Sequence, residues 1–169
     1  KNIFFFKMEF LLHERKFKFV DDELFSFYKR GGLNQIERWY KIKLSLDHGY
    51  KRFAFNIEGK KKSFYYHRVM YYANNPQWDI YDNSINNVID HIDRIKTNNH
   101  ISNLRNVTNQ ENSFNRNAKG YCFIKSLGKY KAEIHVNGKD IYIGLFDTED
   151  EAHQAYLNKK VEVHIIQQR

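Results

Sequence analysis

The chain has 169 residues, with 28 Lys and Arg against 20 Asp and Glu, so its formal net charge is +8 and its pI about 9.4. This length fits one medium domain or two small ones, and the positive charge favours a polyanionic partner, most commonly nucleic acid. A hydrophobic content of 41% excludes wholesale disorder, and a single Cys excludes an internal disulfide and a cysteine-based zinc cluster. No apolar run in the sequence reaches the roughly 18 residues of a membrane span. We therefore expect an intracellular protein with no membrane partner and no structural zinc.

Residues 1–45 are predicted to form a supporting region of strands and one helix. Aromatic and charged residues alternate over 1–20, which indicates one or two strands. Three acidic residues at 21–23 and Lys29-Arg30-Gly31 are typical of the two ends of a helix, because they match the helix dipole and the glycine C-cap.

Residues 39–64 are predicted to form a system of hairpins. Alternating stretches at 41–46 and 52–57 are followed by turn residues at His48-Gly49 and Glu58-Gly59. Ser63 is predicted to cap a helix that reaches Ala73. Tyr66, Val69, Met70 and Ala73 would line its buried face, and His67 and Arg68 are expected to pack.

The segment 85–115 carries the candidate chemistry. It is predicted to form a strand from Ile85 to His91, a loop, a second strand at 104–107 and a helix from Thr108, because Thr108 and Glu111 have the spacing of a capping box. Asp90 and Asn112 offer a carboxylate and an amide oxygen, which are ligands that suit a hard cation such as Mg²⁺ or Mn²⁺. His91 lies beside Asp90, and an imidazole with an unperturbed pKa of about 6.5 suits a general base. This pattern predicts a metal-dependent nuclease.

Several short motifs of this segment resemble those of the HNH nuclease family, in its homing-endonuclease branch. The resemblance implies a ββα-metal fold in which Asp90 and Asn112 bind the metal and His91 is the general base. It also implies that Asn103 pins the loop and orients His91 through backbone hydrogen bonds, and that products carry 5′-phosphate and 3′-hydroxyl ends. Many family members have His where this chain has Asn112. The matching residues are Asp90-His91-Ile92-Asp93, Asn98-Asn99, Asn103-Leu104-Arg105, Val107-Thr108 and Glu111-Asn112.

Single residues of this set also have simpler explanations. Asp90 and Asn103 could form local turns, and Asn112 could be a solvated helix residue. We expect Asp93 to brace the loop, and Asn98 and Asn99 to be turn residues.

Residues 119–160 are predicted to form a three-stranded antiparallel sheet and one helix. The strands are expected at 121–125, 130–136 and 140–146, Asn137-Gly138 is a strong hairpin signal, and Thr148 begins a second capping box. Cys122 is expected to be a small buried hydrophobe. The residues expected to face the helix are Ala132, Ile134, Val136, Ile141 and Ile143.

This C-terminal stretch resembles the AP2 DNA-binding domain, through Gly128-Lys129-Tyr130 and Ile143-Gly144-Leu145-Phe146 among other matches. The resemblance implies a sheet that lies in the major groove of duplex DNA. The dense Arg pattern of plant-type AP2 domains is absent from this stretch. The candidate DNA contacts are Arg116, Lys119, Lys125, Lys129 and Lys131, each of which could equally be a solvated surface charge.

The sequence thus predicts an α+β protein: N-terminal β-hairpins and helix (1–45), a ββα-metal HNH core (46–118), a three-stranded sheet plus one helix (119–160), and a tail (161–169). We expect an endonuclease that acts on double-stranded DNA, encoded by a phage, virus or mobile element. The alternative is a non-catalytic DNA-binding regulator that keeps an inactive HNH scaffold. RNA binding is supported only by charge and aromatic content. The oligomeric state is left open.

Overall fold

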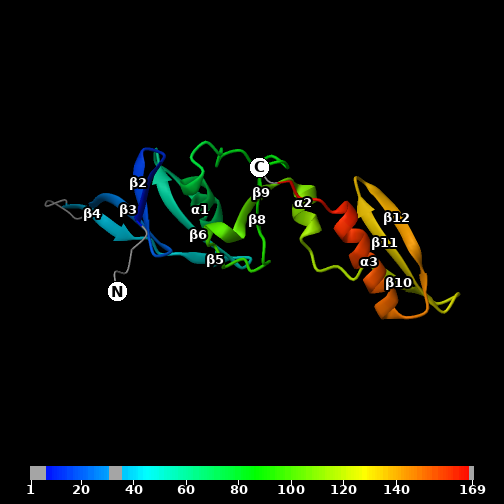
Figure 1. Cartoon of the computed structure of the whole chain (residues 1–169). Helices are drawn as coiled ribbons and strands as arrows, with labels where there is room; N and C mark the ends of the chain where they lie inside the picture. The colour runs from blue at the N-terminus through cyan, green and yellow to red at the C-terminus, as the bar shows by residue number, and fades with distance from the viewer. Residues whose placement is uncertain (1–6, 31–35, 168–169) are drawn as a thin grey trace, which may run out of the picture. The chain divides into compact units, whose positions relative to one another are not determined.

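The computed structural model describes residues 7–30 and 36–167, and it divides into two compact units (Figure 1). Unit 1 comprises residues 1–83 and 89–105, and unit 2 comprises residues 84–88 and 106–169. Mixed α and β elements with several small antiparallel sheets agree with the α+β class predicted.

Two antiparallel sheets and one helix form the frame of unit 1. A four-stranded sheet has the order β1-β2-β3-β4, and a three-stranded sheet has the order β5-β6-β7. Helix α1 (Tyr66–Asn74) follows directly on β7. The strands are β1 (Lys7–Leu12), β2 (Arg15–Val20), β3 (Glu23–Arg30), β4 (Ile36–Lys41), β5 (Ser45–Asp47), β6 (Tyr50–Ile57) and β7 (Lys60–Tyr65).

The predicted helix over 21–30 is wrong, because these residues form a hairpin turn and strand β3. Asp21 and Asp22 have φ values of 47° and 60°, which put them in the left-handed region of a tight turn. Leu24 and Ser26 are buried at a spacing of two residues, which is the period of a strand. The prediction of a helix therefore gave too much weight to the acidic and basic residues at the two ends of the segment and too little to its alternating pattern. Gly31, the predicted helix end, lies outside the described residues.

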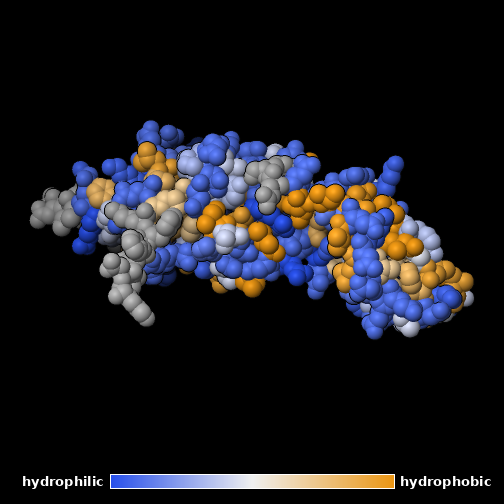
Figure 2. Space-filling model, viewed as in Figure 1, coloured by the Kyte–Doolittle hydropathy of each residue, from blue (hydrophilic) through white to orange (hydrophobic). Residues whose placement is uncertain are grey.

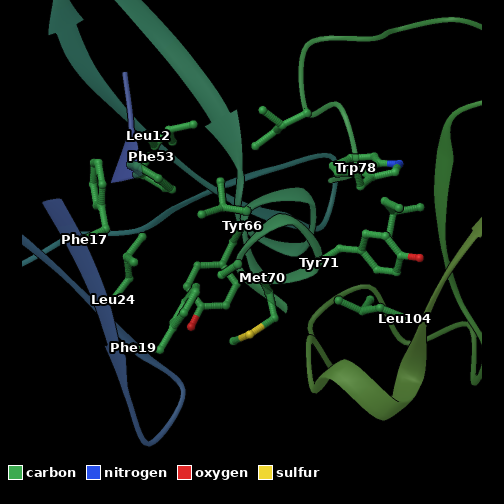
Figure 3. Packing of buried hydrophobic residues seen from close by; sticks show 14 of the residues in the cluster. Leu12, Phe17, Phe19, Leu24, Phe53, Tyr66, Met70, Tyr71, Trp78 and Leu104 are labelled. Carbon is green, nitrogen blue, oxygen red and sulfur yellow. The ribbon is translucent and has the colours of Figure 1, made fainter. Parts of the chain in front are cut away.

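Aromatic and aliphatic side chains together form the core of unit 1, in which seven of the 15 buried residues are aromatic (Figure 3). Phe17 and Phe19 from β2 are almost fully buried, and the Phe19 and Tyr66 rings are T-shaped with their centroids 5.6 Å apart. The predicted buried face of α1 is confirmed, although the helix begins at Tyr66 and Ser63 still belongs to β7. Leu104 joins the same core and so anchors the segment that follows the candidate loop.

The central segment contains the predicted β-β-α elements. Strands β8 (Val88–His91) and β9 (Leu104–Val107) pair, and a short 3-10 turn (Ile101–Asn103) leads into β9. Helix α2 (Asn109–Phe114) follows in unit 2, and the capping box that Thr108 forms with Glu111 is confirmed. The first strand begins at Val88 rather than at Ile85.

Unit 2 contains the predicted three-stranded antiparallel sheet and its helix. The sheet has the order β10-β11-β12, with β10 (Tyr121–Ile124), β11 (Lys129–Val136) and β12 (Lys139–Phe146), and α3 (Glu149–Val163) begins with the second capping box. Ala132 and Ile134 are buried, as are Ala152 and Tyr156 of α3. The hairpin turn at Asn137-Gly138 is confirmed by positive φ values at both residues.

Two burial predictions for this sheet are wrong. Cys122 is exposed, and Ile141 is 37% exposed rather than covered by the helix. Cys122 pairs with Lys131 and so lies on the face of the sheet opposite to that of Ala132 and Ile134. Ile141 pairs with the buried Ile134 and shares its face, so its exposure reflects incomplete cover of that face at this end of the strand. The pairing shifts register between Ala132 and Glu133, so Gly144 rather than Ile143 lies opposite Ala132.

The last described residues pack on α2 instead of forming a free tail. The His164 ring stacks on Phe114 with centroids 3.9 Å apart, and the Gln167 backbone N–H donates to Glu111 Oε1 at 3.0 Å. Figure 2 shows further hydrophobic residues at the visible surface of unit 2, which contains α3 and strands β10 to β12. The large apolar side chains exposed in this unit include Phe123, Leu127, Tyr142, Leu145, Leu157, Val161 and Ile165.

Candidate active site

Strand β8 places the two central residues of the motif in buried positions. Asp90 is 6% exposed and His91 is 4% exposed. A buried carboxylate needs a compensating charge or hydrogen bonds, because desolvation disfavours it strongly. Arg105 on β9 provides that charge, since its Nε and Nη2 both donate to Asp90 Oδ2 at 2.9 and 2.8 Å. The predicted metal ligand is therefore held by a guanidinium group in this structure.

The imidazole of His91 is held by Asn99. His91 Nε2 lies 2.9 Å from Asn99 Oδ1, and the Asn99 amide Nδ2 donates to the Thr97 carbonyl. Because the amide nitrogen is used as a donor, Oδ1 is the acceptor and Nε2 of His91 carries the proton. In the neutral ring, Nδ1 is then the basic nitrogen. Asn99 was expected to be a turn residue, and the structure instead buries it against the predicted general base.

Asn103 closes the loop between the two strands. Its Oδ1 accepts from the Asp93 backbone N–H at 3.0 Å, and its Nδ2 donates to Asp93 Oδ1 and to the Asn98 carbonyl. The Ile92 N–H donates to the Asn103 carbonyl. These bonds fit the loop-pinning part of the predicted role, and the side chain that contacts His91 is that of Asn99.

Asp93 has the bracing position that the sequence predicts. Desolvation raises the pKa of its carboxyl, but donors outweigh this effect and hold the pKa below its usual value. The donors are the Ile95 backbone N–H and the side chains of Asn98 and Asn103. An ionised Asp93 thus keeps the loop in shape.

A cluster of rings surrounds the other side of His91. The His67 ring lies 5.1 Å from the His91 ring at a steep angle, and Tyr50 lies within 6 Å of both. Burial, then the neighbouring His91 and Arg68 charges, lower the pKa of His67 to about 3, and its Nδ1 has no hydrogen-bond partner. Lys96 from the loop donates to the His48 carbonyl and lies 4.5 Å from the Tyr50 ring centroid. His67 therefore stays neutral beside the candidate base.

Asn112, the second predicted metal ligand, lies on α2 in unit 2 and is half-buried. Its pairing with Asp90, which belongs to unit 1, stays a prediction. Over residues 7–30 and 36–167, no group of three or more His, Cys, Asp or Glu side chains is placed to hold a metal ion. A carboxylate and an amide oxygen still fit a hard cation, which often uses only one or two protein ligands.

The predicted DNA contacts of unit 2 fall into two groups. Lys129 is paired with Asp147 at 2.7 Å and Lys131 with Glu133 at 2.8 Å, and these bonds raise the pKa of both lysines. Both lysines thus form ion pairs with acidic residues of the same unit. The exposed cations are Arg116, Lys119 and Lys125.

The contacts of Arg105, Asn99 and His67 were not predicted. Arg105 follows the Asn103 of the motif by two residues, and its sequence carries no sign of the ion pair with Asp90. Asn99 could have been suspected because two Asn residues follow each other in a loop that starts at the candidate base. His67 required the packing of α1 to be known.

Comparisons with known proteins agree with the central part of this assignment. Residues 64–114 match a family model described as HNH endonuclease, so this stretch is similar in sequence to an HNH endonuclease domain. A protein of Acanthamoeba polyphaga mimivirus, named as an uncharacterized HNH endonuclease, is 46% identical over 72 residues. That alignment covers 40% of this chain and 38% of the relative, so the chain spans about two fifths of the relative's length.

The resemblance to the HNH family is thereby confirmed for residues 64–114. The assignment to its homing branch and the AP2-like resemblance of residues 119–160 stay predictions. No solved structure matches the chain. None of the helices formed by the described residues is both long enough and apolar enough to cross a membrane.

Proposed function

We propose that the chain is a metal-dependent endonuclease that cleaves double-stranded DNA, of the homing type within the HNH family. The observation that carries this proposal is the buried pair of Asp90 and His91, with the His91 Nε2 fixed by Asn99. Buried titratable groups are costly to maintain, so their presence in a segment similar to HNH endonucleases supports a catalytic role. The viral source of the relative supports an origin in a virus or mobile element.

In the proposed mechanism, His91 Nδ1 takes a proton from the attacking water. Asn99 accepts from the opposite nitrogen and so favours the tautomer in which Nδ1 is the basic nitrogen. Neutral His67 packs on the ring of His91 and limits its rotation. Asp90 and Asn112 would hold one Mg²⁺ or Mn²⁺, which when bound neutralises phosphate charge and stabilises the leaving 3′-oxygen. Asn103 keeps the loop closed.

The test is the incubation of the full chain with supercoiled plasmid and Mg²⁺, followed by the same reaction with EDTA. We expect conversion to nicked or linear DNA that EDTA abolishes. Asp90→Ala should remove activity at ordinary Mg²⁺ concentrations, because the carboxylate ligand is lost. Undiminished cleavage after thorough chelation would rule out the metal-dependent chemistry.

A second candidate function is a DNA-binding regulator with a silent site. The Arg105 guanidinium on Asp90 favours this candidate, since it already neutralises the carboxylate that a metal would need. The plasmid test separates the two candidates, because the regulator would bind DNA and leave it intact at every metal concentration.

A further inference from the structure

We propose that Arg105 takes the place of the metal at Asp90 in the free protein and moves to a DNA phosphate when substrate and metal bind. The inference rests on the proposed function and adds a regulatory residue to the same site. Arg105 lies in the motif Asn103-Leu104-Arg105 but has no role in the mechanism above.

The geometry of the pair carries the first step. Arg105 Nε and Nη2 converge on one oxygen, Oδ2 of Asp90, from the neighbouring strand of the same two-stranded sheet. The side chain of Asp90 is 7% exposed and that of Arg105 is 27% exposed. One partner is therefore fixed in the interior while the other reaches the surface.

Electrostatics carries the second step. A buried carboxylate without a partner is strongly unfavourable, so Arg105 stabilises the metal-free protein. A divalent cation on the same carboxylate would repel the guanidinium at short range, and one carboxylate does not neutralise both charges. Metal binding thus weakens the hold of Asp90 on Arg105.

The chemistry of the guanidinium carries the third step. Its planar array of donors matches phosphate oxygens as well as it matches a carboxylate, and the match can be bidentate. DNA supplies phosphates at the same time as the metal arrives at Asp90. Arg105 thus exchanges the Asp90 carboxylate for a DNA phosphate and is paired with an anion throughout. Until DNA is present, Arg105 lowers the affinity of the enzyme for the metal.

A purely structural Arg105 would have the opposite effect on metal affinity. A strut that orients Asp90 for the metal would make metal binding weaker when it is removed. A competitor for Asp90 would make metal binding tighter when it is removed. The sign of the change therefore decides between the two roles, and it is measured without DNA cleavage.

The experiment titrates Mn²⁺ into the full chain without DNA by calorimetry, for the wild type, Arg105→Gln and Arg105→Lys. Gln keeps a donor for Asp90 but lacks the charge, so we expect its Mn²⁺ affinity to rise by about 10-fold. Lys keeps the charge without the paired donors, and a rise of the same sign but smaller size is expected. Arg52→Gln is the matched control, because Arg52 is paired with Asp47 in the same unit and its loss should leave Mn²⁺ affinity unchanged.

The second readout is DNA binding and single-turnover cleavage at saturating Mn²⁺. Arg105→Gln should bind DNA more weakly and cut it more slowly than the wild type, although it binds metal more tightly. Equal or weaker Mn²⁺ binding by a folded Arg105→Gln, with wild type that binds metal and cuts, overturns this inference alone. If Gln disturbs folding as judged by circular dichroism, the Lys variant decides by the same sign. A wild type that neither binds Mn²⁺ nor cuts overturns the proposed function and the inference together.

Discussion

The two units of this chain differ in charge and in what they bury. Unit 1 carries 19 Lys and Arg against 12 Asp and Glu, whereas unit 2 carries nine against eight. The positive excess of the chain thus belongs mainly to unit 1, which also buries Asp90, His91 and Asn99. The unit with the AP2-like pattern, by contrast, pairs Lys129 and Lys131 with its own acids. The net charge of the whole chain therefore does not indicate which unit binds a polyanion.

The largest expected effect concerns the chemistry of unit 1. His91→Ala should lower the cleavage rate by about 10²–10⁴, the usual range for the loss of a general base, while DNA affinity changes little. Single-turnover kinetics on plasmid DNA measure this rate. His48→Ala is the control, since His48 is an exposed histidine of the same unit. If His91→Ala cleaves DNA at the wild-type rate, His91 is not the general base.

The next effect separates the stability of the two units. Gly120 has a φ of 73°, and a Cβ there would lie 1.9 Å from the Tyr156 ring. Gly120→Ala should destabilise unit 2 by about 3 kcal/mol, because overpacking adds to backbone strain. Both tryptophans, Trp39 and Trp78, belong to unit 1, so their fluorescence reports that unit alone.

Thermal unfolding followed by fluorescence should therefore be unchanged in Gly120→Ala, while circular dichroism shows an earlier loss of structure. A common shift of both signals would mean that the two units unfold as one.

A third effect is the loss of stability of unit 1 at low pH. His67 has a pKa of about 3 in the folded chain against 6.5 as its ordinary value, so protonation favours the unfolded state. The stability from neutral His67 is complete above pH 6.5 and is lost progressively as the pH falls toward 3. At pH 5 unit 1 should have lost about 2 kcal/mol relative to pH 8.

Urea unfolding followed by tryptophan fluorescence measures this loss. His67→Leu, which cannot be protonated, should show a flatter dependence on pH than the wild type. An unchanged dependence in this variant would assign the acid sensitivity to other groups.

A fourth effect tests where DNA phosphates are bound. Lys125→Gln should reduce the slope of log K against log salt by about 0.9, the value for one phosphate contact. Lys129→Gln and Lys131→Gln should have smaller effects, because each lysine must leave Asp147 or Glu133 to reach a phosphate.

Salt titrations of DNA binding by the full chain give these slopes, with Lys61→Gln as a comparison in unit 1. If all three variants of unit 2 keep the wild-type slope, this unit does not anchor DNA, and the AP2-like assignment has to be dropped.

The smallest effect compares two equivalent helix caps. Thr108 and Thr148 each form a complete capping box, at the starts of α2 and α3. Replacing either by Ala should cost about 1 kcal/mol in the free energy of unfolding. Thr108→Ala should also slow cleavage, because α2 carries Asn112, whereas Thr148→Ala should leave the rate per folded molecule unchanged. If Thr108→Ala and Thr148→Ala change the cleavage rate equally, the catalytic role given to Asn112 on α2 is wrong.

The sequence by itself was enough to predict those structural features that arise from contacts between residues close together in the chain. Both capping boxes and the Asn137-Gly138 turn were predicted, because each is a contact between residues at most three apart. The buried face of α1 was predicted from its helical period. The helix expected over 21–30 failed, since charges at its ends are a weaker signal than the pairing of Glu23 with Val20 across a hairpin.

Only the tertiary structure decided which groups meet. The pairing of β8 with β9 brings Arg105 to Asp90, and the closing of the loop brings Asn99 to His91. The register shift in unit 2 places Gly144 rather than Ile143 opposite Ala132, and the end of the chain returns to α2. The sequence by itself determined the candidate ligands and base through their types and spacing. Their partners depend on burial and strand register, which arise from long-range packing and leave no local pattern.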